Sequence, residues 1–153
     1  MYDFLLTLHS LLRWVVVIAA VLAVVRGFLG WSGKRPWSGL DDRLGLIFTI
    51  SLDVQVLLGL LLYFVLSPIT RAALSNLSAA MSNDVTRFFL AEHFPLMLIA
   101  VVLAHIGRSR ARKAADNQKK FRQTAIWFGI ALLLILAAIP WPFLASGAGR
   151  GLL

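Results

Sequence analysis

Four long apolar stretches, separated by short polar segments, dominate the chain. They cover residues 4–31, 44–66, 85–106 and 124–139. Each is close to the roughly 20 residues that a helix needs to cross a bilayer. The pattern therefore predicts an all-α, integral membrane four-helix bundle, which forms a single domain over residues 1–153 and ends in a mobile, Gly-rich tail at 144–153.

The polar connections contain the residues that end helices. Residues 32–39 include glycine and proline, and the second stretch stops at Ser67-Pro68. We expect residues 69–84, which are rich in Ser, Ala and Asn, to form a surface loop with room for a short helix on the interface. Met1-Tyr2-Asp3 carries no positive charge, so we expect the first stretch to be a retained helix, not a signal peptide.

Basic residues are concentrated in the first and third connections, which lie on the same side of a four-pass chain. They are Lys34, Arg35 and Arg43 in the first, and Arg108, Arg110, Arg112, Lys113, Lys119, Lys120 and Arg122 in the third. The other side has Arg71, Arg87 and Arg150. The positive-inside rule then predicts an up-down-up-down bundle in a bacterial inner membrane, with both termini on the outer, periplasmic side.

Composition excludes several classes of protein. Hydrophobic residues make up 59% of the chain, against about 45–50% in soluble domains. The net charge of +8 sits beside apolar blocks and not on a soluble domain, so we expect membrane lipid and no nucleic acid as a partner. The absence of cysteine excludes disulfides, iron–sulfur clusters and covalently attached c-type haem.

Polar side chains inside the apolar stretches are candidates for function, because they are costly in lipid. They are His9, Arg13, Asp53, Gln55, Glu92, His93 and His105. His9 and His93 lie at matched depths on two helices that run in the same direction, in the outer half of the bilayer. Two such imidazoles can hold a haem iron from opposite faces, which predicts a haem b site with His9 and His93 as metal ligands.

Arg13 lies one turn after His9, and its side chain leans toward the outer surface, where it could reach the carboxylates of a haem. Gly59 leaves space for a ring in the second stretch. The alternative for both histidines is an interfacial role, bonded to water or backbone carbonyls. The alternative for Arg13 is snorkelling to the headgroups.

The remaining polar residues leave several roles open. Gln55 is a candidate for the cofactor site, for bonding between helices, or, with Asp53, for a quinone or proton site. Glu92 either favours the helix dipole or pairs with Arg87. His105 follows His93 by 12 positions, about 18 Å along a helix, where we expect an interfacial residue.

The segment LHSLLRW at 8–14 resembles the opening of a family of small bacterial four-helix membrane proteins labelled cytochrome b-like. VQVLLGLLLYF at 54–64 resembles its second helix, and RFFLAEH at 87–93 with IGRSRARK at 106–113 resembles its third. Family members often have Pro directly after the third-helix His, whereas Phe94 precedes Pro95 here. The resemblance implies the same fold and site residues at His9, Arg13, Gln55, Glu92 and His93.

We therefore expect a b-type haem electron-transfer subunit that exchanges electrons with a quinol or a larger complex near the outer face. No substrate-pocket motif is visible, which favours such a subunit over a complete enzyme. The alternative is a non-catalytic accessory subunit of a respiratory or photosynthetic membrane complex, in which one histidine could ligate a (bacterio)chlorophyll. A third hypothesis is a metal or small-solute transporter, for which four helices are few.

Overall fold

The computed structural model describes residues 1–147, and every regular element in that range is helical. Four helical segments there are long and apolar enough to cross a membrane: Tyr2–Gly33, Gly39–Leu66, Asp84–Lys113 and Asn117–Ala138. The prediction of an all-helical chain with four membrane-compatible segments is therefore confirmed. Of the tail predicted at 144–153, residues 148–153 lie outside the described range, and Ala145–Gly147 forms a short 3-10 turn (η3).

The long helices are α1 (Tyr2–Gly33), α2 (Gly39–Leu61), α6 (Phe94–Lys113) and α7 (Asn117–Ala138). The second segment continues from α2 through a wide π-helical turn, η1 (Leu62–Leu66). The third begins with α5 (Asp84–Arg87) and a second π-helical turn, η2 (Phe88–His93). Pro95, the second residue after η2, has no N–H to donate to the carbonyl four residues earlier, so the regular hydrogen-bond ladder is interrupted where the helix widens.

The third and fourth helical segments are longer than predicted, and the connection between them is correspondingly short. α6 continues through the basic cluster to Lys113, and α7 begins at Asn117. Asp116 starts α7, because its side chain accepts the N–H of Lys119 at 2.8 Å, and this hydrogen bond lowers the pKa of Asp116. The predicted bounds followed apolar residues, whereas a helix continues into polar flanks wherever its ends are capped.

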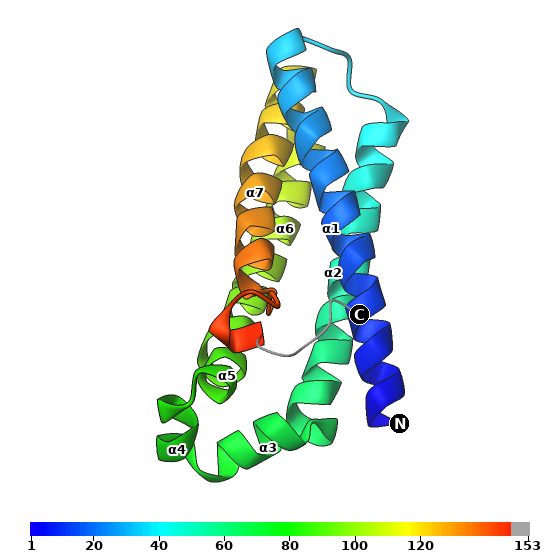
Figure 1. The fold of residues 1–153 in the computed structure, drawn as a ribbon. Coiled ribbons are helices and arrows are strands. Elements are labelled where there is room, and N and C mark those ends of the chain that lie inside the picture. Colours follow the sequence, from blue (N-terminus) through cyan, green and yellow to red (C-terminus); the bar gives the residue numbers. More distant parts are fainter. Residues whose placement is uncertain (148–153) are drawn as a thin grey trace.

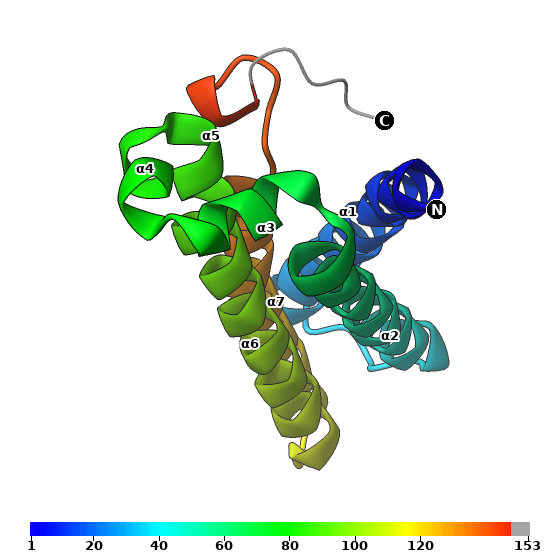
Figure 2. The same ribbon diagram turned by 90° about the horizontal axis from the view of Figure 1, so that it is seen from below.

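Two short helices replace the loop predicted at 69–84. They are α3 (Pro68–Ser75) and α4 (Leu77–Ser82). The side chains of Ser67 and Asn76 cap their N-termini by accepting backbone N–H groups of the first turn. Figure 1 shows them at the end of the molecule that holds the N-terminus, opposite the connection between α1 and α2. Seen from that end in Figure 2, α3 leads away from α2 toward α4 and α5.

Small residues bring the long helices close together. A Cβ atom added to Gly27 of α1 would lie 2.9 Å from the backbone nitrogen of Ala125 in α7. A Cβ atom at Gly107 of α6 would lie 2.5 Å from Cβ of Trp127 in α7. Such close approach is common between membrane helices, where van der Waals packing drives association. The core is formed by Val16, Ala19, Ala20, Ala23, Phe48, Leu52, Ala100, Ala104, Phe128, Ala131 and Ile135.

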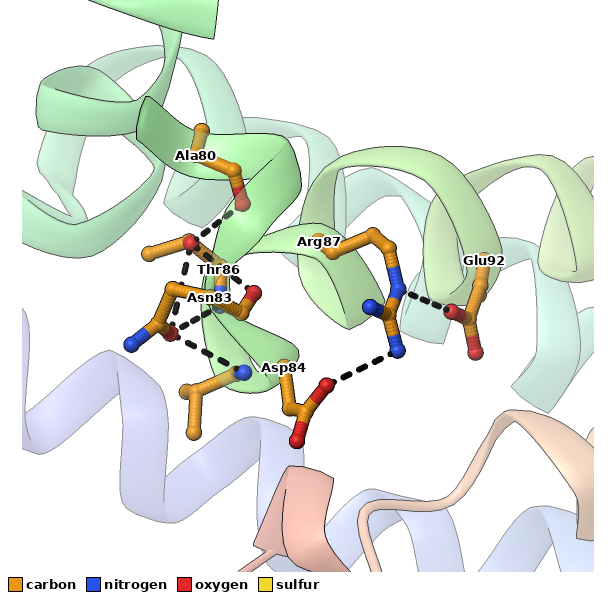
Figure 3. Close-up of polar contacts among 7 residues, drawn as sticks. Ala80, Asn83, Asp84, Thr86, Arg87 and Glu92 are labelled. Carbon is orange, nitrogen blue, oxygen red and sulfur yellow. Dashed lines mark hydrogen bonds and ion pairs between the residues drawn. The ribbon is translucent and has the colours of Figure 1, made fainter. Parts of the chain in front are cut away.

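A polar network fixes the junction between α4, α5 and η2 (Figure 3). The hydroxyl of Thr86 donates to the carbonyl of Ala80 at 2.7 Å. Arg87 pairs with Asp84 at 3.0 Å and with Glu92 at 3.3 Å. The Arg87–Glu92 pair was one of the two roles expected for Glu92, and it attaches the start of the third segment to the turn that carries His93.

Candidate functional site

A partly open cavity of about 340 Å³ lies between the helices at the end of the bundle that holds the N-terminus. Ligand pockets typically measure about 300–1,000 Å³. Most of the lining is apolar. Its polar members include Thr7, His9, Ser10, Arg13, Gln55, Tyr63, Thr70 and His93. All four predicted cofactor-site residues thus lie on one cavity, although they come from α1, α2 and η2.

His9 and His93 lie next to each other in this cavity. Their ring centroids are 6.5 Å apart, and the ring planes are inclined by 65°. The structure therefore brings together two imidazoles that the sequence predicted at similar levels of their helices. The aromatic rings of Phe88 and Phe89 flank His93, with centroids 6.0 and 5.7 Å away.

The end of α7 determines the tautomer of His93. Nδ1 of His93 lies 2.7 Å from the carbonyl oxygen of Ala138, and because a carbonyl only accepts, Nδ1 carries the hydrogen and Nε2 the lone pair. The Ala138 carbonyl is available because α7 ends there, with Ile139 in an extended conformation. The residue that would donate to it in a longer helix is Pro142, which has no N–H. A ring nitrogen that donates to a backbone carbonyl is the usual partner arrangement of a metal-binding histidine.

Gln55 of α2 holds His9 through two contacts. Its amide nitrogen donates to the backbone carbonyl of His9 at 3.0 Å and lies 3.2 Å from Nε2 of the ring. An amide nitrogen donates, so Nε2 of His9 also carries the lone pair and Nδ1 the hydrogen. Within residues 1–147, Nδ1 of His9 and Oε1 of Gln55 are buried with no hydrogen-bond partner. Buried polar atoms of this kind are typical of a site that takes a ligand or water.

Gly59 of α2 leaves room for the His9 ring of α1 to approach Gln55. A Cβ atom at Gly59 would lie 3.2 Å from Cε1 of the His9 ring. The space that the sequence predicted beside Gly59 is therefore present, and the imidazole of His9 packs into it.

Arg13 and Tyr63 complete the polar part of the wall. Arg13 lies one turn after His9 on the same face of α1, with its guanidinium carbon 5.5 Å from the centroid of the Trp14 ring. Tyr63 donates its hydroxyl hydrogen to the carbonyl of Leu90 at 3.3 Å and stacks on Phe94 with centroids 4.7 Å apart. We did not predict Tyr63, although its position two turns after Gln55 places it on the same face of the second segment.

Asp53 and His105 lie away from the cavity and contact each other. Nε2 of His105 is 2.7 Å from Oδ1 of Asp53. The sequence did not predict this pair, because the interfacial position expected for His105 and the mid-span position of Asp53 gave no reason to join them. Neither residue therefore belongs to the site formed by His9 and His93.

The distance between the two imidazole rings is close to that of two ligands on opposite sides of one metal. Metal–imidazole bonds are about 2.0–2.1 Å long, so two imidazoles on opposite sides of one metal have ring centroids roughly 6 Å apart. The observed separation is 6.5 Å, and both rings hold the lone pair on Nε2. Iron at His9 would have to replace the N–H of Gln55, which uses that lone pair in the structure.

Comparison of the chain with protein-family models, curated proteins and solved structures gave no match. The resemblance to cytochrome b-like proteins therefore stays a prediction from the motif residues.

Proposed function

We propose that this chain is a b-type haem subunit that transfers electrons in a bacterial inner membrane, with His9 and His93 as axial ligands. The main support is the pair of imidazoles in one cavity, 6.5 Å apart, each with its lone pair on Nε2. A bound haem would supply a one-electron redox centre. Two imidazole ligands fill both axial positions, which favours electron transfer over oxygen binding.

The other residues of the cavity would orient the ligands and receive the haem carboxylates. The Ala138 carbonyl fixes the ring of His93, and Gln55 fixes that of His9. Arg13 lies one turn from His9 on the cavity wall, where its positive charge suits a haem carboxylate. The apolar remainder of the wall would limit water and so favour transfer of an electron alone.

The distribution of charge supports an outer location for the site. The basic connection at 34–38 and the basic end of α6 lie opposite the end that holds the cavity (Figure 1). Under the positive-inside rule this arrangement corresponds to an up-down-up-down bundle with both termini and the cavity on the periplasmic side. We expect a quinol or a larger respiratory or photosynthetic complex to exchange electrons with the site there.

A second candidate is an accessory subunit that binds a (bacterio)chlorophyll. Gln55 already engages Nε2 of His9, whereas the bond from Nδ1 of His93 to Ala138 keeps the lone pair of that ring on Nε2, and His93 lines the cavity. The magnesium of such a pigment takes one axial nitrogen, which His93 alone could supply.

The test is a dithionite-reduced minus oxidised absorption spectrum of the detergent-purified chain, expressed with haem supplied. We expect a sharp b-type α-band that is absent in His9→Ala and His93→Ala. His105→Ala, which removes the histidine outside the cavity, is the control and should retain the band. Equal retention of the α-band in all three variants would contradict the ligand assignment. A colourless protein would favour an accessory subunit without pigment. A green pigment would favour the second candidate.

A further inference from the structure

The pair formed by Asp53 of α2 and His105 of α6 is half exposed on the outside of the bundle. Their side chains are 41% and 50% exposed. Asp53 lies near the middle of Gly39–Leu66, a segment apolar enough to cross a membrane, and its contact with His105 places the His105 imidazole deeper than the interfacial level expected from the sequence. In a membrane the exposed part of the pair therefore faces lipid unless another molecule covers it. Ionisable side chains in membrane spans almost always face a bundle interior or a water-filled cavity. The pair therefore indicates that something packs against this face.

The surface around the pair suits another helical protein. Leu46, Ile50, Asp53 and Leu57 follow one another on α2 at steps of four, three and four residues, and Leu98, Val102, His105 and Ser109 do so on α6. This spacing is that of the contact positions in helices that pack side by side. The apolar members of both rows are exposed. An apolar row that continues on both sides of the polar pair favours a packed helix over a small ligand that would cover the pair alone.

A second contact keeps the two rows in a fixed relation. Nη1 of Arg108 in α6 donates to the carbonyl of Asp42 in α2 at 3.0 Å. Together with the Asp53–His105 bond, it links α2 and α6 at two levels. The two rows therefore form one surface, hereafter the α2–α6 face, with an acidic group on one helix beside a basic group on the other.

We propose that two copies of this chain associate through the α2–α6 face about a twofold axis, so that His105 of each copy meets Asp53 of the other. A twofold interface places the same patch of both subunits in contact, and a patch with one acid and one base is complementary to itself. Nε2–H of His105 donates to Oδ1 within the chain, which leaves Nδ1 of His105 and Oδ2 of Asp53 for the second copy, and Nδ1 donates to Oδ2 when the imidazole carries a hydrogen on both nitrogens. With imidazolium and carboxylate, the four side chains form a closed network of zero net charge, shielded from lipid. The proposal requires the helices to lie in a membrane but does not depend on the haem.

Cysteine cross-linking can test the interface directly, because the chain contains no cysteine. Val102→Cys and Ile50→Cys place a thiol on the α2–α6 face, and Leu133→Cys places one on α7, where the native side chain is 68% exposed. In proteoliposomes with a membrane-permeant oxidant, we expect a disulfide-linked dimer for at least one variant on the face and none for Leu133→Cys. Equal cross-linking at Leu133, or none at both positions on the face, would overturn the proposal.

The polar network can be tested by removing both of its members at once, so that no single charge is left in lipid. In Asp53→Leu/His105→Leu we expect roughly tenfold weaker dimerisation, from mass measurements over a dilution series in detergent. The exchanged variant Asp53→His/His105→Asp restores both contacts and should dimerise like the original, which keeps the test valid if the double-leucine variant folds poorly. A double-leucine variant that folds and dimerises unchanged would refute the network. The proposal would also be refuted if the original chain were monomeric and a lipid-soluble molecule or a different protein covered this face. The haem content of each variant reports separately on the proposed function.

Discussion

Replacement of Gly27 by alanine tests the contact between α1 and α7. The added Cβ would lie 2.9 Å from the backbone nitrogen and 3.1 Å from Cα of Ala125, and ordinary contact begins at 3.4 Å. Backbone atoms cannot turn away as a side chain can, so the two helices must separate by roughly 0.5 Å, the difference between 3.4 and 2.9 Å. Overpacking of this kind costs about 1–3 kcal/mol, while the change from glycine to alanine in a helix contributes about 1 kcal/mol in the opposite sense.

Gly129→Ala is the matched control, because Gly129 lies within α7 and a Cβ there meets no atom within 4 Å. Both variants carry the same gain in helix propensity, so the difference between them isolates the packing cost. We expect the free energy of unfolding of Gly27→Ala to be about 1–3 kcal/mol below that of Gly129→Ala. Tryptophan fluorescence during titration of mixed micelles with dodecyl sulfate measures both. Equal stability of the two variants would refute the inferred helix contact.

Three further predictions address the cavity and the helix junctions. Gly59→Ala places a Cβ 3.2 Å from Cε1 of His9, so the imidazole must shift. Haem titration of the apoprotein should then show about tenfold weaker affinity, and unchanged affinity would argue against His9 as a haem ligand. Asp41→Asn weakens the 2.6 Å ion pair with Arg26 and should lower the free energy of unfolding by about 1–3 kcal/mol in the micelle assay. Thr86→Val removes the hydroxyl that donates to α4 and should cost about 1 kcal/mol, with faster hydrogen exchange in α4; unchanged exchange would argue against that bond.

Periodicity and residue type were enough to predict the four apolar segments and the two histidines of the cavity. The positions of His9 and His93 gave their depth, because rise per residue is nearly constant along a helix. The rotation of each helix about its axis was not available from the sequence. This, together with the different depths expected for them, is why Asp53 and His105 were not predicted to meet. Tyr63 was missed although its spacing from Gln55 places it on the same face of the second segment.

The hydrogen bond from His93 to Ala138 was also beyond sequence reasoning. Pro140 and Pro142 mark the end of α7, but which side chain meets the freed carbonyl depends on how α6 and α7 pack. The helix bounds were imprecise for a different reason. The apolar pattern ends at the edge of the hydrocarbon, whereas the helix continues into the polar residues beyond it.

The π-helical turn at Phe88–His93 has a consequence for the comparison of related chains. A π turn holds one residue more than a regular turn, so it can absorb a single inserted residue while the helix on either side keeps its register. The resemblance inferred from the sequence motifs predicts proline directly after the histidine, whereas Phe94 stands between His93 and Pro95 here. An alignment of this segment should therefore allow a one-residue gap, and a chain without the extra residue would reach the same histidine position through an ordinary α-helical turn.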